Sequence, residues 1–139
     1  MKLKLFSPIA IIIAGLTMII ITSAFKPLYQ KKPWPVPDNF KNMKSTVASN
    51  AESIAAGKAL WSLHCASCHG KTGLGDGSKA DQLKTVPPDF SKADVQSESD
   101  GSVFYKTSEG RDDMPSFKKK IADQDDIWSL VVYIRTLKK

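Results

Sequence analysis

Five consecutive residues constrain this chain more than any others: Cys65-Ala66-Ser67-Cys68-His69. Two cysteines three positions apart, with a histidine directly after the second, form the attachment pattern of c-type haem. The two thiols add across the two vinyl groups of a porphyrin, and one turn of chain presents both sulfurs to one edge of the ring. The imidazole of His69 then lies under the iron, where it is a good axial ligand. The pattern predicts one covalent haem c, with its iron, as the centre of the fold.

Other uses of such a motif fit this chain less well. A structural zinc site needs four ligands, usually in two separated pairs, whereas every cysteine and histidine here falls in one turn: His64, Cys65, Cys68 and His69. A thioredoxin-like motif follows a strand of a βαβ unit, and no strand pattern precedes residue 65. A disulfide within the motif would make no use of the histidine.

The front of the chain carries a targeting signal. Lys2 and Lys4 precede an uncharged run from residue 5 to residue 25, which is 21 residues long (25 − 5 + 1). A signal peptide has an apolar region of about 7–15 residues, whereas a membrane-spanning helix needs about 20. Length therefore favours a membrane anchor through residues 5–25, while the small residues Ser23 and Ala24 would permit cleavage of a signal peptide. With residues 1–25 as signal peptide or anchor, the rest of the chain is expected outside the cytoplasmic membrane, on the periplasmic side.

Residues 26–48 are predicted to be a proline-rich linker. Prolines favour an extended backbone and resist helix formation, and four of them gather here: Pro27, Pro33, Pro35 and Pro37. Two interpretations stay open. The segment is either a stiff spacer or a strap that packs onto the following domain through Trp34 or Phe40.

The charge balance indicates protein partners. The formal net charge is +6, and without Lys2 and Lys4 the remaining 18 basic and 14 acidic residues give +4 (18 − 14). A mild basic excess favours association with acidic redox proteins. No cluster of basic and aromatic residues and no nucleic-acid-binding motif is present, so nucleic acid is not an expected partner.

Residues 49–139 are predicted to form an all-α domain. Ser49 and Glu52 have the spacing of a capping box for a helix that ends near Leu63. Gly57 is unexpected inside this helix, because glycine there costs about 1 kcal/mol relative to alanine. Close approach of another helix would explain it, and Trp61 would lie beside that contact.

The later helices have local signals of their own. A short helix is expected within residues 78–84, and Ser99 caps a helix that ends near Gly110. The acidic residues 123–126 suit the start of the last helix. Its apolar residues keep helical spacing: Ile127, Leu130, Val131, Ile134 and Leu137.

Met114 is the predicted second axial ligand. A thioether is a soft, neutral ligand that raises the reduction potential of a haem when it is paired with histidine. The other methionines lie in the leader and the linker: Met1, Met18 and Met43. Pro115 would stiffen the loop that carries the sulfur.

The run 87–90 is expected to support the histidine. A backbone carbonyl of Pro87 or Pro88 would accept the Nδ1 proton of His69 and fix the imidazole, and Phe90 would pack on the ring. His64 adjoins the attachment turn and is interpreted as a packing or surface residue. Arg111 is a candidate for pairing with a haem propionate.

From about residue 49 to residue 139 the chain resembles a class I cytochrome c. The resemblance rests on Cys-Ala-Ser-Cys-His-Gly, Gly-x-Gly-Asp-Gly, Pro-Pro-Asp-Phe, Met-Pro and the terminal Leu-Val-Val-Tyr-Ile, in that order. It implies a small cytochrome c fold, preceded here by the apolar N-terminal segment, in which the first and last helices cross around a covalently bound haem. Gly57 and Trp61 would then meet Leu130 and Tyr133. The histidine–carbonyl bond of the family corresponds to Pro87 or Pro88.

Two functions follow from these expectations. A haem with histidine and methionine on its two faces has no site for a substrate, so the first is a one-electron carrier that is not an enzyme. Its donor and acceptor would be redox proteins. The second is a haem c subunit of a larger oxidoreductase, or a mono-haem catalytic protein with an open iron site.

Overall fold

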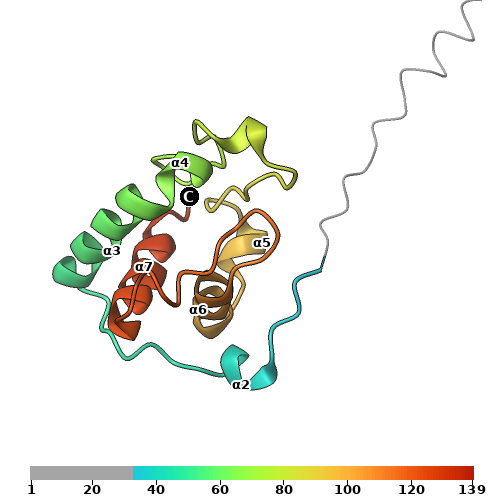
Figure 1. Ribbon diagram of the computed structural model, residues 1–139. Coiled ribbons are helices and arrows are strands. Elements are labelled where there is room, and N and C mark those ends of the chain that lie inside the picture. The colour runs from blue at the N-terminus through green and yellow to red at the C-terminus, as the bar shows by residue number, and fades with distance from the viewer. Residues whose placement is uncertain (1–32) are drawn as a thin grey trace, which may run out of the picture. The chain divides into compact units, whose positions relative to one another are not determined.

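A computed structural model describes residues 33–139, and helices are the regular elements of this part of the chain (Figure 1). They are α2 (Asp38–Lys41), α3 (Ala51–His64), α4 (Ala66–His69), the 3₁₀ turn η1 (Ala80–Gln82), α5 (Ala93–Gln96), α6 (Asp100–Glu109) and α7 (Gln124–Thr136). The one β-type pairing found within residues 33–139 is an isolated bridge between Arg111 and Met114. The prediction of an all-α domain is confirmed.

The predicted leader, residues 1–25, lies outside the described residues. Between residues 33 and 139, no helix combines the length and the apolar content that a membrane crossing requires. The short helix expected within residues 78–84 is the 3₁₀ turn η1.

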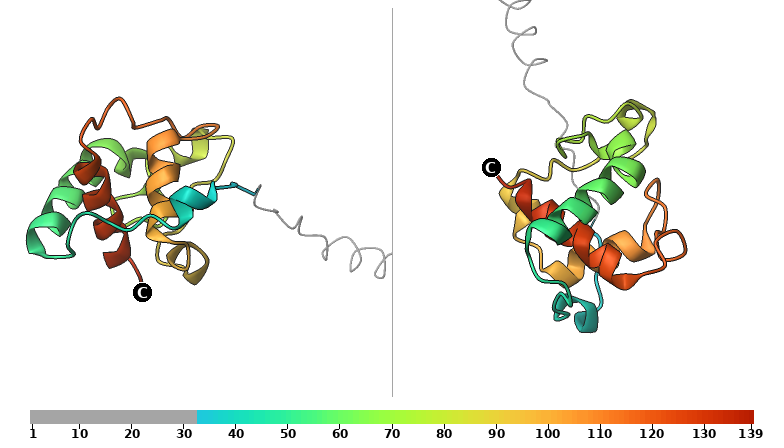
Figure 2. Two further views of the ribbon diagram at one scale, coloured as in Figure 1. Left: turned by 90° about the horizontal axis from the view of Figure 1, so that it is seen from below. Right: turned by 90° about the vertical axis from the view of Figure 1, so that its left-hand side faces the viewer.

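The crossing of α3 and α7 organises the domain, and both views of Figure 2 show these two helices in contact. Gly57 lies at the crossing, where a Cβ atom added to it would lie 2.0 Å from the backbone oxygen of Ser129 and 2.8 Å from the Cβ of Tyr133. Trp61 continues the contact, with its ring 5.8 Å from that of Tyr133. The predicted close approach at Gly57 is confirmed. Ser129, whose backbone comes closest to the glycine, was not foreseen.

The hydrophobic core lies around this crossing and against α6. Phe104 of α6 stacks on Trp128 of α7, with ring centroids 4.4 Å apart. The residues of the core cluster are Trp61, Val103, Phe104, Phe117, Ile121, Ile127, Trp128, Leu130, Val131, Tyr133 and Ile134. Most come from α6 and α7, so the apolar spacing predicted for the last helix describes its buried face.

The start of α3 differs from the predicted capping box by one residue. Asn50 is the N-cap: its side chain accepts a hydrogen bond from the Ser53 backbone N–H at 2.9 Å. The Ser53 hydroxyl in turn accepts one from the Asn50 N–H at 3.1 Å. The expectation that Ser49 and Glu52 form the box was therefore wrong, because a second pair with the same spacing lies one residue further on.

This cap gives a direct test. Asn50→Ala should lower the free energy of unfolding by about 1 kcal/mol, because it leaves helix N–H groups without an acceptor. Ser49→Ala, at an exposed position outside the observed box, should change it by less than about 0.5 kcal/mol. Denaturant unfolding of the two variants measures the difference. A larger loss for Ser49→Ala than for Asn50→Ala would contradict the observed cap.

The boundaries of α6 and α7 agree with the sequence signals. Ser99 caps α6 by accepting from the Ser102 N–H, and the helix ends before Gly110, which has φ 67°. Asp123 caps α7 by accepting from the Asp125 N–H. Both predicted helix starts are confirmed.

Residues 35–48 pack as a strap on the helical domain, and the compact unit runs from Pro35 to Lys139. The Phe40 ring lies 4.8 Å from that of Tyr105 in α6. A Cβ atom on Gly101 would lie 1.9 Å from the Phe40 carbonyl oxygen, so the strap touches the backbone of α6. The Thr46 hydroxyl donates to Asp125 at 2.6 Å. The proline-rich segment was expected to be either a stiff spacer or a packed strap, and residues 35–48 form a packed strap.

Candidate functional site

The attachment motif forms a single helical turn at the end of α3. Cys65 ends α3 and begins α4. Its carbonyl accepts hydrogen bonds from the N–H groups of Cys68, at 3.1 Å, and His69, at 2.9 Å. The two cysteines are therefore one turn apart on the same side of the backbone. Both are free and half-buried.

A glycine-rich loop is bonded to the carbonyl end of this turn. The N–H groups of Gly75 and Gly77 donate to the carbonyls of His69 and Cys68, at 2.9 and 3.2 Å. A Cβ atom on Gly77 would lie 2.4 Å from the carbonyl oxygen of Ser67, so only glycine fits there. The loop holds the motif by its backbone and leaves its side chains available.

Aromatic rings enclose His69. The imidazole lies 5.7 Å from Trp61 and 5.2 Å from Phe90, and these two rings meet edge to face at 5.3 Å. The Trp61 indole N–H donates to the Gly70 carbonyl at 3.0 Å. Burial lowers the pKa of His69 to about 4, so the imidazole is neutral at neutral pH, as a metal ligand must be. Phe90 thus contacts the predicted ligand, His69, and its packing on the haem ring stays a prediction.

The predicted carbonyl partner of His69 is not in place. The His69 Nδ1 is buried and has no hydrogen-bond partner in the part of the chain that is described. The carbonyl oxygens of Pro87 and Pro88 lie close to Gly75: a Cβ atom there would be 2.5 Å from the Pro87 oxygen and 3.4 Å from the Pro88 oxygen. The iron would be held by the other ring nitrogen, Nε2, so the unpaired Nδ1 marks only the hydrogen bond that is missing behind the ligand.

Burial also acts on the first thiol of the motif. It raises the pKa of Cys65 to about 12, with a smaller contribution from the neighbouring Cys68, so the thiol is protonated at neutral pH. Within residues 33–139, no group of three or more histidine, cysteine, aspartate or glutamate side chains is arranged to hold a metal ion. Two thiols and one neutral imidazole in a single turn are the donor set that a covalent haem requires.

Met114 lies in a tight turn that follows α6. Arg111 and Met114 exchange two backbone hydrogen bonds, at 2.8 and 2.9 Å. Asp112 in this turn has φ 52°. The loop is tied back to α6 because the Ser116 hydroxyl donates to the Ser108 carbonyl at 2.7 Å. Met114 is half-buried and packs against the core cluster, as Cys65 and Phe90 also do.

A further bond joins the Met114 turn to the segment before Pro87. The Thr85 N–H donates to the Asp113 carboxylate at 3.0 Å. Sequence reasoning missed this link because no local pattern connects residues 28 positions apart. His64 packs against Phe117, with ring centroids 5.8 Å apart, which agrees with a packing role. Arg111 lies 3.4 Å from the Asp112 carboxylate.

Comparisons with known proteins agree on one family. A family model described as cytochrome C oxidase, cbb3-type, subunit III, matches residues 52–134. A structure from the Kuenenia stuttgartiensis reducing HAO-like protein complex Kustc0457/Kustc0458 is 28% identical, with a TM-score of 0.63, and the match covers 78% of this chain and 52% of that one. This chain thus spans about half of that relative. The KustC0563 c-type cytochrome is 29% identical, with a TM-score of 0.53, over 60% of this chain and 98% of that one. A search of curated proteins found no match.

Proposed function

Because the chain belongs to the family described as cytochrome C oxidase, cbb3-type, subunit III, and so is a mono-haem cytochrome c domain, we propose that it is a one-electron carrier whose iron is ligated by His69 and Met114. The covalent haem c, attached through Cys65 and Cys68, supplies a one-electron iron couple when bound. Ligation of the iron by Met114 is the feature that distinguishes an electron carrier from a haem catalyst. With both axial positions filled by the protein, no coordination site remains for a substrate.

The placement of Met114 carries this proposal. Of the two methionines in residues 33–139, Met43 belongs to the strap and lies against Gly101 of α6. Both methionines pack on the core cluster, but Met114 lies outside the strap, in a turn held by two backbone hydrogen bonds. A thioether fixed by its backbone changes little in position when charge moves, which suits electron transfer.

The histidine side has a matching role. Trp61 and Phe90 keep water from His69 and support its neutral form. Their rings limit its movement, so the imidazole stays a ligand in either oxidation state. The chain thus binds and orients the haem, and the basic balance of the chain would guide acidic redox partners to it.

Replacement of Met114 tests the proposal. Met114→Ala should open one axial position, so that the reduced holoprotein binds carbon monoxide readily and its reduction potential falls by about 0.1 V or more, within the ~0.8 V range that axial ligands span. Optical titration and potentiometry measure the two effects. Met43→Ala, the matched control, should behave like the parent protein. Ready binding of carbon monoxide by the parent would instead support a catalytic haem protein with an open iron site.

A second function is a haem c subunit of a larger oxidoreductase. The description of the family names a subunit of an oxidase, and one of the similar structures comes from a HAO-like protein complex. The same axial ligands would serve in this case, and only the partner would differ. Purification from membranes in mild detergent, followed by native mass spectrometry, distinguishes a free carrier from a subunit that keeps its partner.

Placement outside the cytoplasmic membrane, with residues 5–25 as anchor, completes the proposal. The support is the run of 21 uncharged residues after Lys2 and Lys4, which is about the length that a spanning helix needs. Mass spectrometry of the mature protein tests it. A mass that lacks the first residues would show a cleaved signal peptide.

A further inference from the structure

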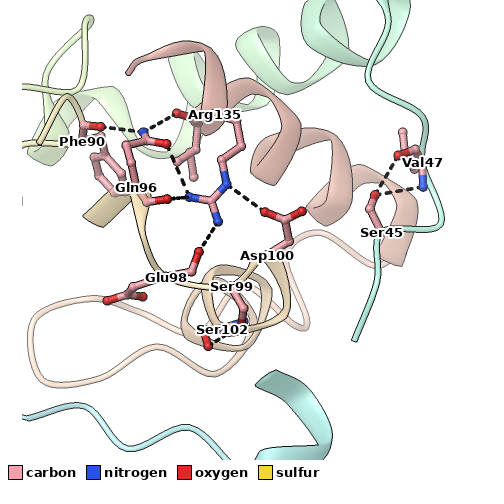
Figure 3. A network of polar contacts seen from close by, with 10 residues as sticks. Ser45, Val47, Phe90, Gln96, Glu98, Ser99, Asp100, Ser102 and Arg135 are labelled. Atoms are coloured by element: carbon pink, nitrogen blue, oxygen red, sulfur yellow. Dashed lines mark hydrogen bonds and ion pairs between the residues drawn. The ribbon is translucent and has the colours of Figure 1, made fainter. Parts of the chain in front are cut away.

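Gln96 links the aromatic side of the haem site to the last helix (Figure 3). It lies at the end of α5 and is half-buried. Its side-chain NH₂ group donates to the Phe90 carbonyl at 2.6 Å and to the Ile134 carbonyl of α7 at 3.0 Å. Both donor hydrogens of the amide are thus used, on two segments that lie far apart in the sequence.

Arg135 fixes the orientation of this amide. One terminal nitrogen of its guanidinium lies 3.4 Å from both the backbone and the side-chain oxygen of Gln96. The other donates to the Glu98 carbonyl at 2.6 Å, and Nε donates to Asp100 at 2.8 Å. The planar guanidinium presents its donors in a rigid fork. The oxygen of the Gln96 amide therefore faces Arg135, and its nitrogen faces Phe90.

The network reaches the haem ligand through Phe90. The Phe90 backbone is held on both sides, because its N–H donates to the Gly73 carbonyl at 2.7 Å and its carbonyl accepts from Gln96. Its ring lies edge-on against His69, with centroids 5.2 Å apart and planes inclined by 64°. The His69 Nδ1 has no hydrogen bond in the described structure. The packed rings therefore carry much of the task of orienting the imidazole.

From these contacts we infer that Gln96, oriented by Arg135, is a positioning residue for the axial histidine. Groups behind a metal ligand orient it and tune the metal, and here the path runs from the amide to the Phe90 backbone and from the Phe90 ring to the imidazole. Loss of the amide would free the Phe90 carbonyl and let the imidazole turn. The inference rests on the proposed ligation of the iron by His69.

Gln96→Leu in the full holoprotein tests this role, since leucine keeps similar bulk and removes both donors. We expect the equilibrium constant for reduction by a redox dye to change about threefold or more, the size of effect that one lost hydrogen bond produces. The electron paramagnetic resonance g values of the oxidised protein, which report the imidazole orientation, should shift. Amide hydrogen exchange at Phe90 should become faster. If Gln96→Leu does not fold, Gln96→Glu serves, because a carboxylate keeps its contact with Arg135 but cannot donate to Phe90.

Asn50→Ala is the matched control. It removes the N-cap hydrogen bond of α3, which involves none of the residues of the Gln96 network. It should leave the reduction equilibrium and the g values as in the parent. Unchanged values for Gln96→Leu, or equal shifts for Asn50→Ala, would overturn the inference. A parent protein that lacked the signals of an imidazole-bound iron would instead refute the proposed ligation.

Discussion

Replacement of Gly57 by alanine is expected to destabilise the domain by about 3 kcal/mol, although alanine is the better helix former. Helix propensity alone favours the substitution by about 1 kcal/mol. At this position, however, the new Cβ would lie 2.0 Å from the Ser129 oxygen and 2.6 Å from the Ser129 carbonyl carbon. Both are backbone atoms and cannot rotate away, so α3 and α7 must move apart. Overpacking of a well-packed core costs about 1–3 kcal/mol and sometimes more.

Denaturant unfolding of the holoprotein measures this effect. Ala56→Val is the matched control, because it adds two methyl groups to the neighbouring, exposed position of the same helix. It should cost less than about 1 kcal/mol, the penalty of a β-branched residue on a helix surface. A stabilised Gly57→Ala protein would show that the helices do not touch at this residue.

Replacement of Cys65 and Cys68 together by serine is expected to abolish covalent haem binding. A hydroxyl does not form the thioether that each cysteine thiol contributes. The protein should therefore lose the haem mass increment completely in denaturing mass spectrometry. It should also be less stable to denaturant than the parent, because the covalent haem is the predicted centre of the fold.

Ser67→Ala is the control for the double replacement. Ser67 lies between the two cysteines and is exposed, with its hydroxyl 3.8 Å from the Cys68 sulfur. This variant should keep the full haem mass and unfold like the parent. Covalent haem that survived in the double serine variant would contradict attachment through these sulfurs.

Local signals in the sequence predicted the parts of the fold that depend on neighbouring residues. Ser99, Gly110 and Asp123 mark helix ends through hydrogen bonds that span only a few residues, and the structure has these ends. The start of α3 shows the limit of such signals. Asn50 with Ser53 and Ser49 with Glu52 have equal spacing, so the choice between them depends on how the chain enters the helix.

Contacts between distant segments were harder to predict. The presence of a glycine inside a helix predicted the close approach at Gly57. Nothing in the sequence around Ser129 indicated that its backbone would be the contact. The contact of Phe40 with Tyr105 was an open alternative, because proline-rich sequence describes a packed strap and a free spacer equally well. The bonds of Gln96 join three segments through single polar groups. No periodic pattern in the sequence predicts such hydrogen bonds.

The candidate site was predictable in its residue types and only partly in its geometry. Cys65, Cys68 and His69 follow from their spacing alone, and one helical turn holds them. Met114 followed from the lack of another methionine in a suitable place, and its ligation stays a prediction. The hydrogen bond expected between His69 and the carbonyl of Pro87 or Pro88 is not formed in the structure, where the His69 Nδ1 has no partner among the described residues.

The pairing of α3 with α7 also determines when the hydrophobic core of the domain can form. These are the earliest long helix and the final helix of the described chain, so their shared core cannot assemble until residues 124–136 have been synthesised and delivered. Until then α3, which ends in the attachment turn, lacks the helix on which Gly57 and Trp61 pack. Haem attachment before that point would therefore take place on an incomplete core.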